Sequence, residues 1–226
     1  MSLREAGEGD QRQMAKTGFS SCIECNSARS ARLIVIRGNS ASGKSAVAAE
    51  IRRRHGRGLA IVGQDNLRRQ VLREQDVPGG ANIDLIDLTA RFALDRGFHV
   101  IVEGILYADH YDAMLTALIA DREGSARAYY LDVPWAETLR RHACKPQAAE
   151  YGESEMRGWY RERDLLPGGL EQLIPASSSL DETVRRMMAD AGLGRERESA
   201  PLSASVGRAR CASSANGRCD TAGACR

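Results

Sequence analysis

One eight-residue segment has the residue types and spacing of a phosphate-binding loop, Gly38-Asn39-Ser40-Ala41-Ser42-Gly43-Lys44-Ser45. Its glycines permit backbone angles at which successive N–H groups converge on phosphate oxygens. Lys44 can bridge the β- and γ-phosphates of a nucleoside triphosphate, and the Ser45 hydroxyl can bind Mg²⁺. The chain has only two other lysines, so a serine-rich turn with an accidental lysine is the weaker explanation. All eight residues are therefore candidate nucleotide-binding residues.

Asp65 closes a second apolar segment, Leu59–Val62, and is a candidate catalytic residue. A carboxylate there would face the γ-phosphate across a cleft, where it can orient an acceptor hydroxyl and take its proton. Arg68, one helical turn further on, can hold an anionic part of the acceptor or the transferring phosphoryl group. The alternative is that Asp65 only caps the following helix.

Glu103 follows a third apolar segment, His99–Val102, and is a candidate metal ligand together with Ser45. An acid at the end of a strand beside the phosphate loop can hold Mg²⁺ directly or through water. Aspartate is commoner than glutamate in that position. Binding of the acceptor by Glu103 and a purely structural role both remain open.

The stretch from 139 to 164 is rich in basic residues, and Arg141 and Arg161 are the members that we assign to nucleotide binding and to catalysis. Arg141 and Lys145 are spaced to share a helix face, as are Arg157 and Arg161. A mobile lid that closes arginines over the triphosphate would exclude water and neutralise charge. A solvated pair of charged helices, balanced by nearby glutamates, is the alternative.

Short apolar strands alternate with helical patterns, which predicts an α/β protein with a parallel sheet covered by helices on both faces. Right-handed crossovers place the carboxyl ends of such strands along one edge, where ligands bind. The phosphate loop, Asp65 and Glu103 all follow strands and should therefore meet there. The expected strands are 33–36, 59–62, 99–102, 126–133 and 170–174. The first expected helix follows the phosphate loop, and the others cover 66–75, 83–96, 109–122, two parts of 135–164, and 180–191. Ser179 or Asp181 should cap the last of these helices.

Composition limits the class of protein. The 226 residues are 42% hydrophobic and 27% charged, as in a globular protein with a core, and no apolar run is long enough for a membrane helix. The net charge of +2 comes from the C-terminal tail, so no nucleic-acid-binding face is expected. Five of the six cysteines lie near the ends, which favours reduced thiols and a cytoplasmic location over a disulfide framework or a zinc site at Cys22 and Cys25.

We expect three regions: a disordered extension over 1–30, a folded domain over 31–193, and a disordered Arg-, Ser- and Cys-containing tail over 194–226. The extension and the tail carry too few large apolar residues to order themselves. The oligomeric state cannot be read from the chain.

The phosphate loop, the Asp65/Arg68 pair, the strand that ends in Glu103-Gly104 and the arginine-rich stretch together resemble the small P-loop kinases. These include adenylate, shikimate and gluconate kinases, chloramphenicol phosphotransferase, polynucleotide kinase and the zeta toxins. The resemblance covers about 31–193 and implies a three-layer P-loop NTPase fold, with a parallel five-stranded sheet and a helical lid. Asp65 matches their acceptor-orienting acid, and the loop at 174–177 matches their adenine-side loop.

The resemblance implies a magnesium-dependent kinase that transfers the γ-phosphate of ATP to the hydroxyl of a small molecule. One alternative is a toxin- or resistance-type kinase that acts on a nucleotide sugar or an antibiotic. The other is a nucleotide-dependent switch or ATPase that works with a macromolecular partner. The acceptor pocket is expected around 66–91, with Tyr107 and Tyr111.

Overall fold

Five parallel strands form one sheet in the order β2-β3-β1-β4-β5 in the computed structural model, which describes residues 30–144 and 149–194. The described residues all belong to one compact unit. The predicted terminal regions lie outside them, apart from residues 30 and 194, as do Lys145 and the Cys22/Cys25 pair. The strands are β1 (Leu33–Arg37), β2 (Leu59–Gly63), β3 (His99–Glu103), β4 (Ala126–Asp132) and β5 (Glu171–Pro175).

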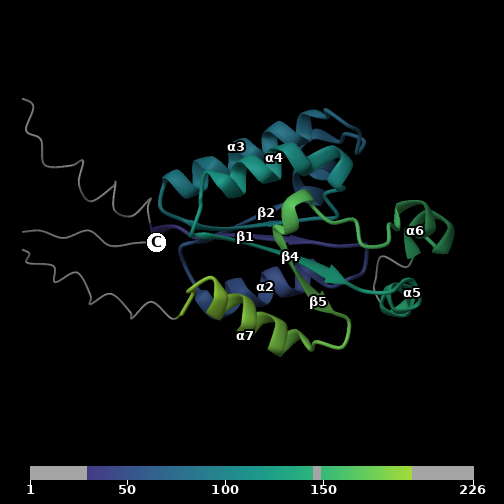
Figure 1. The fold of residues 1–226 in the computed structure, drawn as a ribbon. Coiled ribbons are helices and arrows are strands. Elements are labelled where there is room, and N and C mark those ends of the chain that lie inside the picture. Colours follow the sequence, from purple (N-terminus) through teal and green to yellow (C-terminus); the bar gives the residue numbers. More distant parts are fainter. Residues whose placement is uncertain (1–29, 145–148, 195–226) are drawn as a thin grey trace, which may run out of the picture. The chain divides into compact units, whose positions relative to one another are not determined.

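Helices cover both faces of the sheet, as predicted (Figure 1). Helices α3 and α4 lie on one face, and α2 and α7 lie on the other, whereas α5 and α6 lie beyond one end of the strands. The bounds are α2 (Lys44–His55), α3 (Ala81–Asp95), α4 (Ala108–Ala120), α5 (Trp135–Ala143), α6 (Glu153–Trp159) and α7 (Leu180–Asp190), with a π-helix η1 (Asn66–Leu72) and a short 3-10 turn η3 (Pro167–Gly169).

The central strand β1 is buried along its whole length, which explains its continuous apolar sequence. Side chains alternate between its two faces. Leu33 and Val35 join the core under α3 and α4, whereas Ile34 and Ile36 join the core under α2 and α7. Two separate cores therefore fix the sheet between its helical layers.

The predicted elements are found with small shifts at their ends, and two details differ. The expected cap of α7 is confirmed, because the Ser179 hydroxyl accepts a hydrogen bond from the Glu182 N–H. The helix expected over 66–75 is a π-helix that stops at Leu72. The prediction that Arg157 and Arg161 share a helix face is wrong, because α6 ends at Trp159. None of the helices in the described ranges has the length and apolar character to span a bilayer.

Buried tyrosines give the fold a sensitivity to alkaline pH. Burial raises the pKa of Tyr107 and of Tyr130 to about 12, and it also raises the pKa values of Tyr111 and Tyr129. An unfolded chain releases these protons near pH 10, so above that pH the unfolded state binds fewer protons than the native state. The free energy of unfolding should therefore fall as the pH rises above about 10. Urea denaturation at a series of pH values measures this loss; phenolate absorbance that develops near pH 10 while the circular dichroism stays native would contradict it.

Candidate active site

The phosphate-loop segment connects β1 to α2 and has the backbone that its sequence predicts. Gly38 and Gly43 take positive φ angles of 139° and 109°. A Cβ at Gly38 would lie 2.8 Å from the Leu131 carbonyl oxygen, so no larger residue fits there without a shift of the backbone. These two glycines hold the loop folded over the N-terminus of α2, which carries a partial positive charge suited to an anion.

Lys44 is held against the loop that precedes it. Its side chain is buried, and Nζ donates hydrogen bonds to the Asn39 carbonyl oxygen at 2.8 Å and to the Ser42 Oγ at 3.4 Å. The ammonium group is thereby fixed beside the converging backbone N–H groups. This arrangement can place a positive charge on a bound phosphate.

Ser45 and Glu103 are brought together by the pairing of β1 with β3. The Ser45 hydroxyl donates a hydrogen bond to the Glu103 Oε2 at 3.0 Å. Burial raises the pKa of Glu103, while Lys44 and the Ser45 hydrogen bond act in the opposite direction. A hydroxyl and a carboxylate in contact are the oxygen donors that Mg²⁺ takes, so the pair fits this metal.

Asp65 projects into the space in front of the loop. Its side chain is 75% exposed, and the Arg68 Nη2 donates to its Oδ1 at 3.2 Å. The Asp65 side chain makes no capping hydrogen bond to η1, so the structure does not show the cap that was the alternative role. A cavity of about 570 Å³, here called the loop cavity, is lined by Ser40, Ala41, Gly43, Lys44, Ser45, Ala46, Asp65, Arg69, Gln70, Glu103, Gly104, Ile105, Glu150 and Tyr151.

A second cavity, of about 380 Å³, adjoins the first and is here called the aromatic cavity. Tyr107 lines it as expected, but Tyr111 does not. The Tyr111 side chain is fully buried, and its hydroxyl bonds with Gln64, Asn82 and Asp76 beneath the cavity. The full lining is Ser40, Asp65, Arg68, Arg69, Gln75, Asp76, Ile105, Tyr107, Tyr151 and Trp159.

Arg141 contacts the phosphate loop from α5. Its Nη1 donates to the Ser42 carbonyl oxygen at 2.9 Å, and its Nη2 donates to the Ala176 carbonyl oxygen at 3.1 Å. Arg141 also pairs with Glu137. The guanidinium thus connects the loop to the segment after β5, and the nucleotide-binding role assigned to Arg141 stays a prediction.

Arg161 lies beyond the end of α6 and contacts the loop at Asn39. Its backbone N–H donates to the Asn39 side chain at 2.9 Å, its guanidinium pairs with Asp109 at 2.7 Å, and it stacks on the Tyr107 ring at 4.2 Å. It lines neither the loop cavity nor the aromatic cavity. The catalytic role assigned to Arg161 from the sequence stays a prediction.

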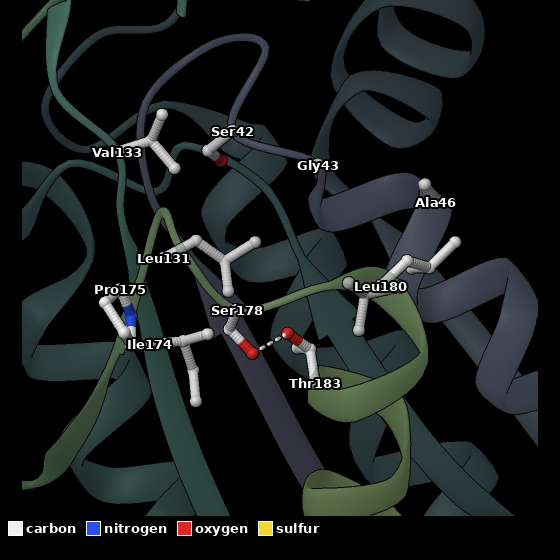
Figure 2. A pocket seen from close by; sticks show the side chains of 11 residues that line it. Ser42, Gly43, Ala46, Leu131, Val133, Ile174, Pro175, Ser178, Leu180 and Thr183 are labelled. Atoms are coloured by element: carbon white, nitrogen blue, oxygen red, sulfur yellow. Dashed lines mark hydrogen bonds between the residues drawn. The ribbon is translucent and has the colours of Figure 1, made fainter. Parts of the chain in front are cut away.

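A third, smaller pocket of about 130 Å³ lies beside Ser42 and Gly43. Figure 2 shows aliphatic side chains around it, among them Leu131, Ile174 and Leu180. The Ser178 and Thr183 hydroxyls form a hydrogen bond with each other at 2.9 Å at the same pocket. The pocket is mainly apolar, and two residues of the loop that the resemblance matched to an adenine-side loop, Ile174 and Pro175, line it.

Arg37 is a residue of the site region that sequence reasoning missed. It ends β1 immediately before Gly38, and its side chain is completely buried. Its guanidinium pairs with Glu171 at 2.9 Å and Asp164 at 3.0 Å, and its Nε donates to the Leu106 carbonyl oxygen. An arginine at the end of an apolar strand was the available signal, because such a charge needs buried partners.

Replacing Arg37 by Met should lower the free energy of unfolding by about 3–5 kcal/mol, because Glu171 is also buried and would lose its partner. Arg185→Met is the control, since Arg185 forms a solvent-exposed ion pair with Asp181, whose loss should change the stability little. Urea denaturation measures both values. Equal effects of the two substitutions would show that Arg37 does not stabilise the fold through its buried pairs.

Comparison with known proteins agrees with this geometry. A family model described as an AAA domain matches residues 33–163. The APS kinase CysC of Mycobacterium tuberculosis, solved in complex with AMPPNP and APS, is 20% identical over 72% of this chain and 98% of its own, with a TM-score of 0.58. None of the curated proteins matches the chain significantly.

Two further solved structures have the same fold. The tunicamycin resistance protein of Deinococcus radiodurans is 18% identical over 73% of this chain and 97% of its own, with a TM-score of 0.53. A gluconokinase from Sinorhizobium meliloti 1021 is 16% identical over 71% of this chain and 91% of its own, with a TM-score of 0.51. The predicted P-loop fold with a five-stranded parallel sheet is therefore confirmed.

Proposed function

The chain belongs to the AAA domain family, and from this membership and the geometry of its site we propose that it is a P-loop kinase. It transfers the γ-phosphate of ATP to a hydroxyl of a small molecule. The observation that carries the proposal is the junction of two cavities at Asp65. The loop cavity holds the phosphate-binding residues, and the aromatic cavity next to it has room for an acceptor.

ATP binds with its phosphates in the loop from Gly38 to Ser45 and its base in the pocket of Figure 2. The backbone N–H groups and Lys44 hold the β- and γ-phosphates. A planar, weakly polar base suits a pocket lined by Leu131, Ile174 and Leu180. Arg141 stabilises the loop between the two parts of the nucleotide through its bonds to Ser42 and Ala176.

Ser45 and Glu103 would hold the metal that accompanies the nucleotide. Mg²⁺, when bound to a triphosphate, neutralises charge on the β- and γ-phosphate oxygens. Because the Ser45 hydroxyl donates its hydrogen to Glu103, its oxygen lone pairs would be available to the cation. A cation there would also stabilise the charged form of Glu103, which burial disfavours.

Asp65 receives the proton in the transfer step. The acceptor hydroxyl oxygen forms a bond to the γ-phosphorus, the bond between that phosphorus and the β,γ-bridging oxygen breaks, and ADP leaves with that electron pair. The hydroxyl proton passes to the Asp65 carboxylate, which is exposed at the junction of the cavities and therefore accessible to the acceptor. Arg68 keeps that carboxylate oriented through its hydrogen bond.

Measurement of ADP release from Mg·ATP tests the proposal. The purified protein is incubated with a panel of nucleosides, sugars and hydroxyl-bearing antibiotics, and phosphorylated products are identified by mass spectrometry. Stimulation of ADP release by an acceptor, with one phosphoryl group found on that acceptor for each ADP formed, is the expected result. Slow hydrolysis that no acceptor stimulates would favour a nucleotide-dependent switch or ATPase instead.

A further inference from the structure

The loop cavity and the aromatic cavity share five lining residues, and one of them is a cation. The shared residues are Ser40, Asp65, Arg69, Ile105 and Tyr151. A group bound between the cavities therefore lies beside both the proposed proton acceptor and the guanidinium of Arg69. The sequence analysis selected Arg68 as the anion-binding arginine, so the two neighbouring arginines need to be compared.

Arg68 is already engaged in the structure. It donates to the Asp65 carboxylate at 3.2 Å and to the Glu74 carbonyl oxygen at 3.2 Å, and its side chain is mostly buried. These contacts hold Arg68 at the wall of the aromatic cavity, beside Asp65. Both terminal nitrogens of its guanidinium, Nη1 and Nη2, already have acceptors.

Arg69 has no ion pair or hydrogen bond with any residue in the described parts of the chain. The other arginines near the site all have such partners: Arg68 with Asp65, Arg141 with Glu137, and Arg161 with Asp109. A guanidinium presents paired N–H donors that match the oxygens of a carboxylate or a phosphate. Arg69 is thus free to bind an anionic group at the junction of the cavities.

The rest of the aromatic cavity suits a ring. Tyr107, Tyr151 and Trp159 all line this cavity and are here called the aromatic wall. The Tyr151 and Trp159 ring centroids lie 5.0 Å apart, and the Tyr107 hydroxyl donates to the Trp159 backbone carbonyl oxygen at 3.0 Å. Aromatic side chains of this kind can pack against a flat or puckered ring of a ligand. Asp76, held by Gln64 and Tyr111, adds a fixed carboxylate that accepts hydrogen bonds from ring hydroxyls.

We propose that the acceptor is a ring-bearing alcohol that carries an anionic oxygen group, a carboxylate or a phosphate, and that Arg69 recognises this group. The inference rests on the proposed kinase function and names the class of substrate for the same site. The ring packs against the aromatic wall, one hydroxyl reaches Asp65, and the anionic group binds the guanidinium of Arg69. Arg69 is therefore the residue that determines acceptor specificity.

Matched pairs of acceptors test the inference: adenosine and adenosine 5′-monophosphate, glucose and glucose 6-phosphate, and glucose and glucuronate. In each pair only the anionic group differs. We expect the anionic member of at least one pair to have a kcat/KM that is about 10- to 100-fold higher, the effect of one charge-assisted interaction. In Arg69→Met this ratio should fall toward 1, mainly through KM, and Arg69→Lys should restore part of it.

Arg73→Met is the matched control. Arg73 follows the same π-helix, is exposed and lines neither cavity, so its loss removes the same charge without touching the acceptor. The ratio in Arg73→Met should equal that of the wild type. Thermal unfolding of all variants shows whether they are folded.

Binding is measured beside turnover, by titrating each acceptor into protein saturated with Mg·AMPPNP and following the fluorescence of Trp159 in a Trp135→Phe background. Equal use of neutral and anionic members, an unchanged ratio in Arg69→Met, or failure of every anionic member to bind or react would overturn the inference. If the inference fails in one of these ways but a neutral acceptor is phosphorylated, the proposed kinase function is still supported. Anionic members that bind through Arg69 but never receive phosphate would support the acceptor site and contradict the kinase function.

Discussion

Replacing Asp65 by Asn should reduce acceptor-dependent ADP release by about 10²- to 10⁴-fold, while the affinity for ATP stays close to that of the wild type. A general base contributes a factor of this size, and the amide of Asn cannot take the proton of the acceptor hydroxyl. Asp65 is largely exposed and caps no helix, so the substitution should not unfold the protein. Steady-state kinetics with the best acceptor and a titration with a labelled nucleotide measure the two effects.

Asp84→Asn provides the control for this prediction. Asp84 is an exposed residue of α3 that lines neither cavity, so its substitution removes the same charge at a distance from the site. The kinetics of that variant should match the wild type. A protein that works as a nucleotide-dependent switch would bind its partner equally well with Asn at position 65, and full activity of Asp65→Asn would contradict the assignment of the base.

Replacing Lys44 by Met should lower kcat by about 10²- to 10³-fold, the effect of removing one preorganised positive group from a transferring phosphoryl group. Methionine keeps the length of the apolar stem, which is buried in the structure, but loses the charge and the hydrogen bonds to Asn39 and Ser42. The affinity for ATP should fall as well, because in the proposed complex Lys44 holds the β- and γ-phosphates before and during transfer. ADP release and nucleotide titration measure both quantities.

Arg52→Met is the control for Lys44, because Arg52 is an exposed cation on the same helix α2 and lines neither cavity. It should leave ADP release unchanged. Since the Lys44 contacts also stabilise the loop, circular dichroism and thermal unfolding of both variants are needed. A folded Lys44→Met protein with wild-type turnover would show that the phosphate loop does not hold the reacting nucleotide.

Several features of the site could be predicted from short segments of sequence. The loop from Gly38 to Ser45 depends on spacing within eight residues, and the structure reproduces the positive φ angles that its glycines allow. The apolar strands depend on local composition, and parallel pairing then brings their carboxyl ends to one edge. This is why the Ser45 Oγ and the Glu103 Oε2 lie 3.0 Å apart although the two residues are 58 positions apart in the chain.

The arginines show where sequence periodicity fails. The segment after Asp65 is a π-helix, in which hydrogen bonds span five residues and the rotation per residue differs from that of an α-helix. A period of 3.6 residues therefore gives no reliable direction for Arg68 or Arg69. Arg161 likewise lies beyond the end of α6, where no helical spacing applies.

The sequence by itself determined the elements, the phosphate loop and the two carboxylates that follow strands, because each of these depends on residues close together in the chain. Only the tertiary structure decided what surrounds them. The aromatic wall takes Tyr107 from the start of α4, Tyr151 from the segment before α6 and Trp159 from its end. The buried Arg37 likewise finds its acids more than 120 residues away. Such contacts form because buried charges and apolar rings must find partners in the folded chain, and the identity of those partners depends on packing between distant segments.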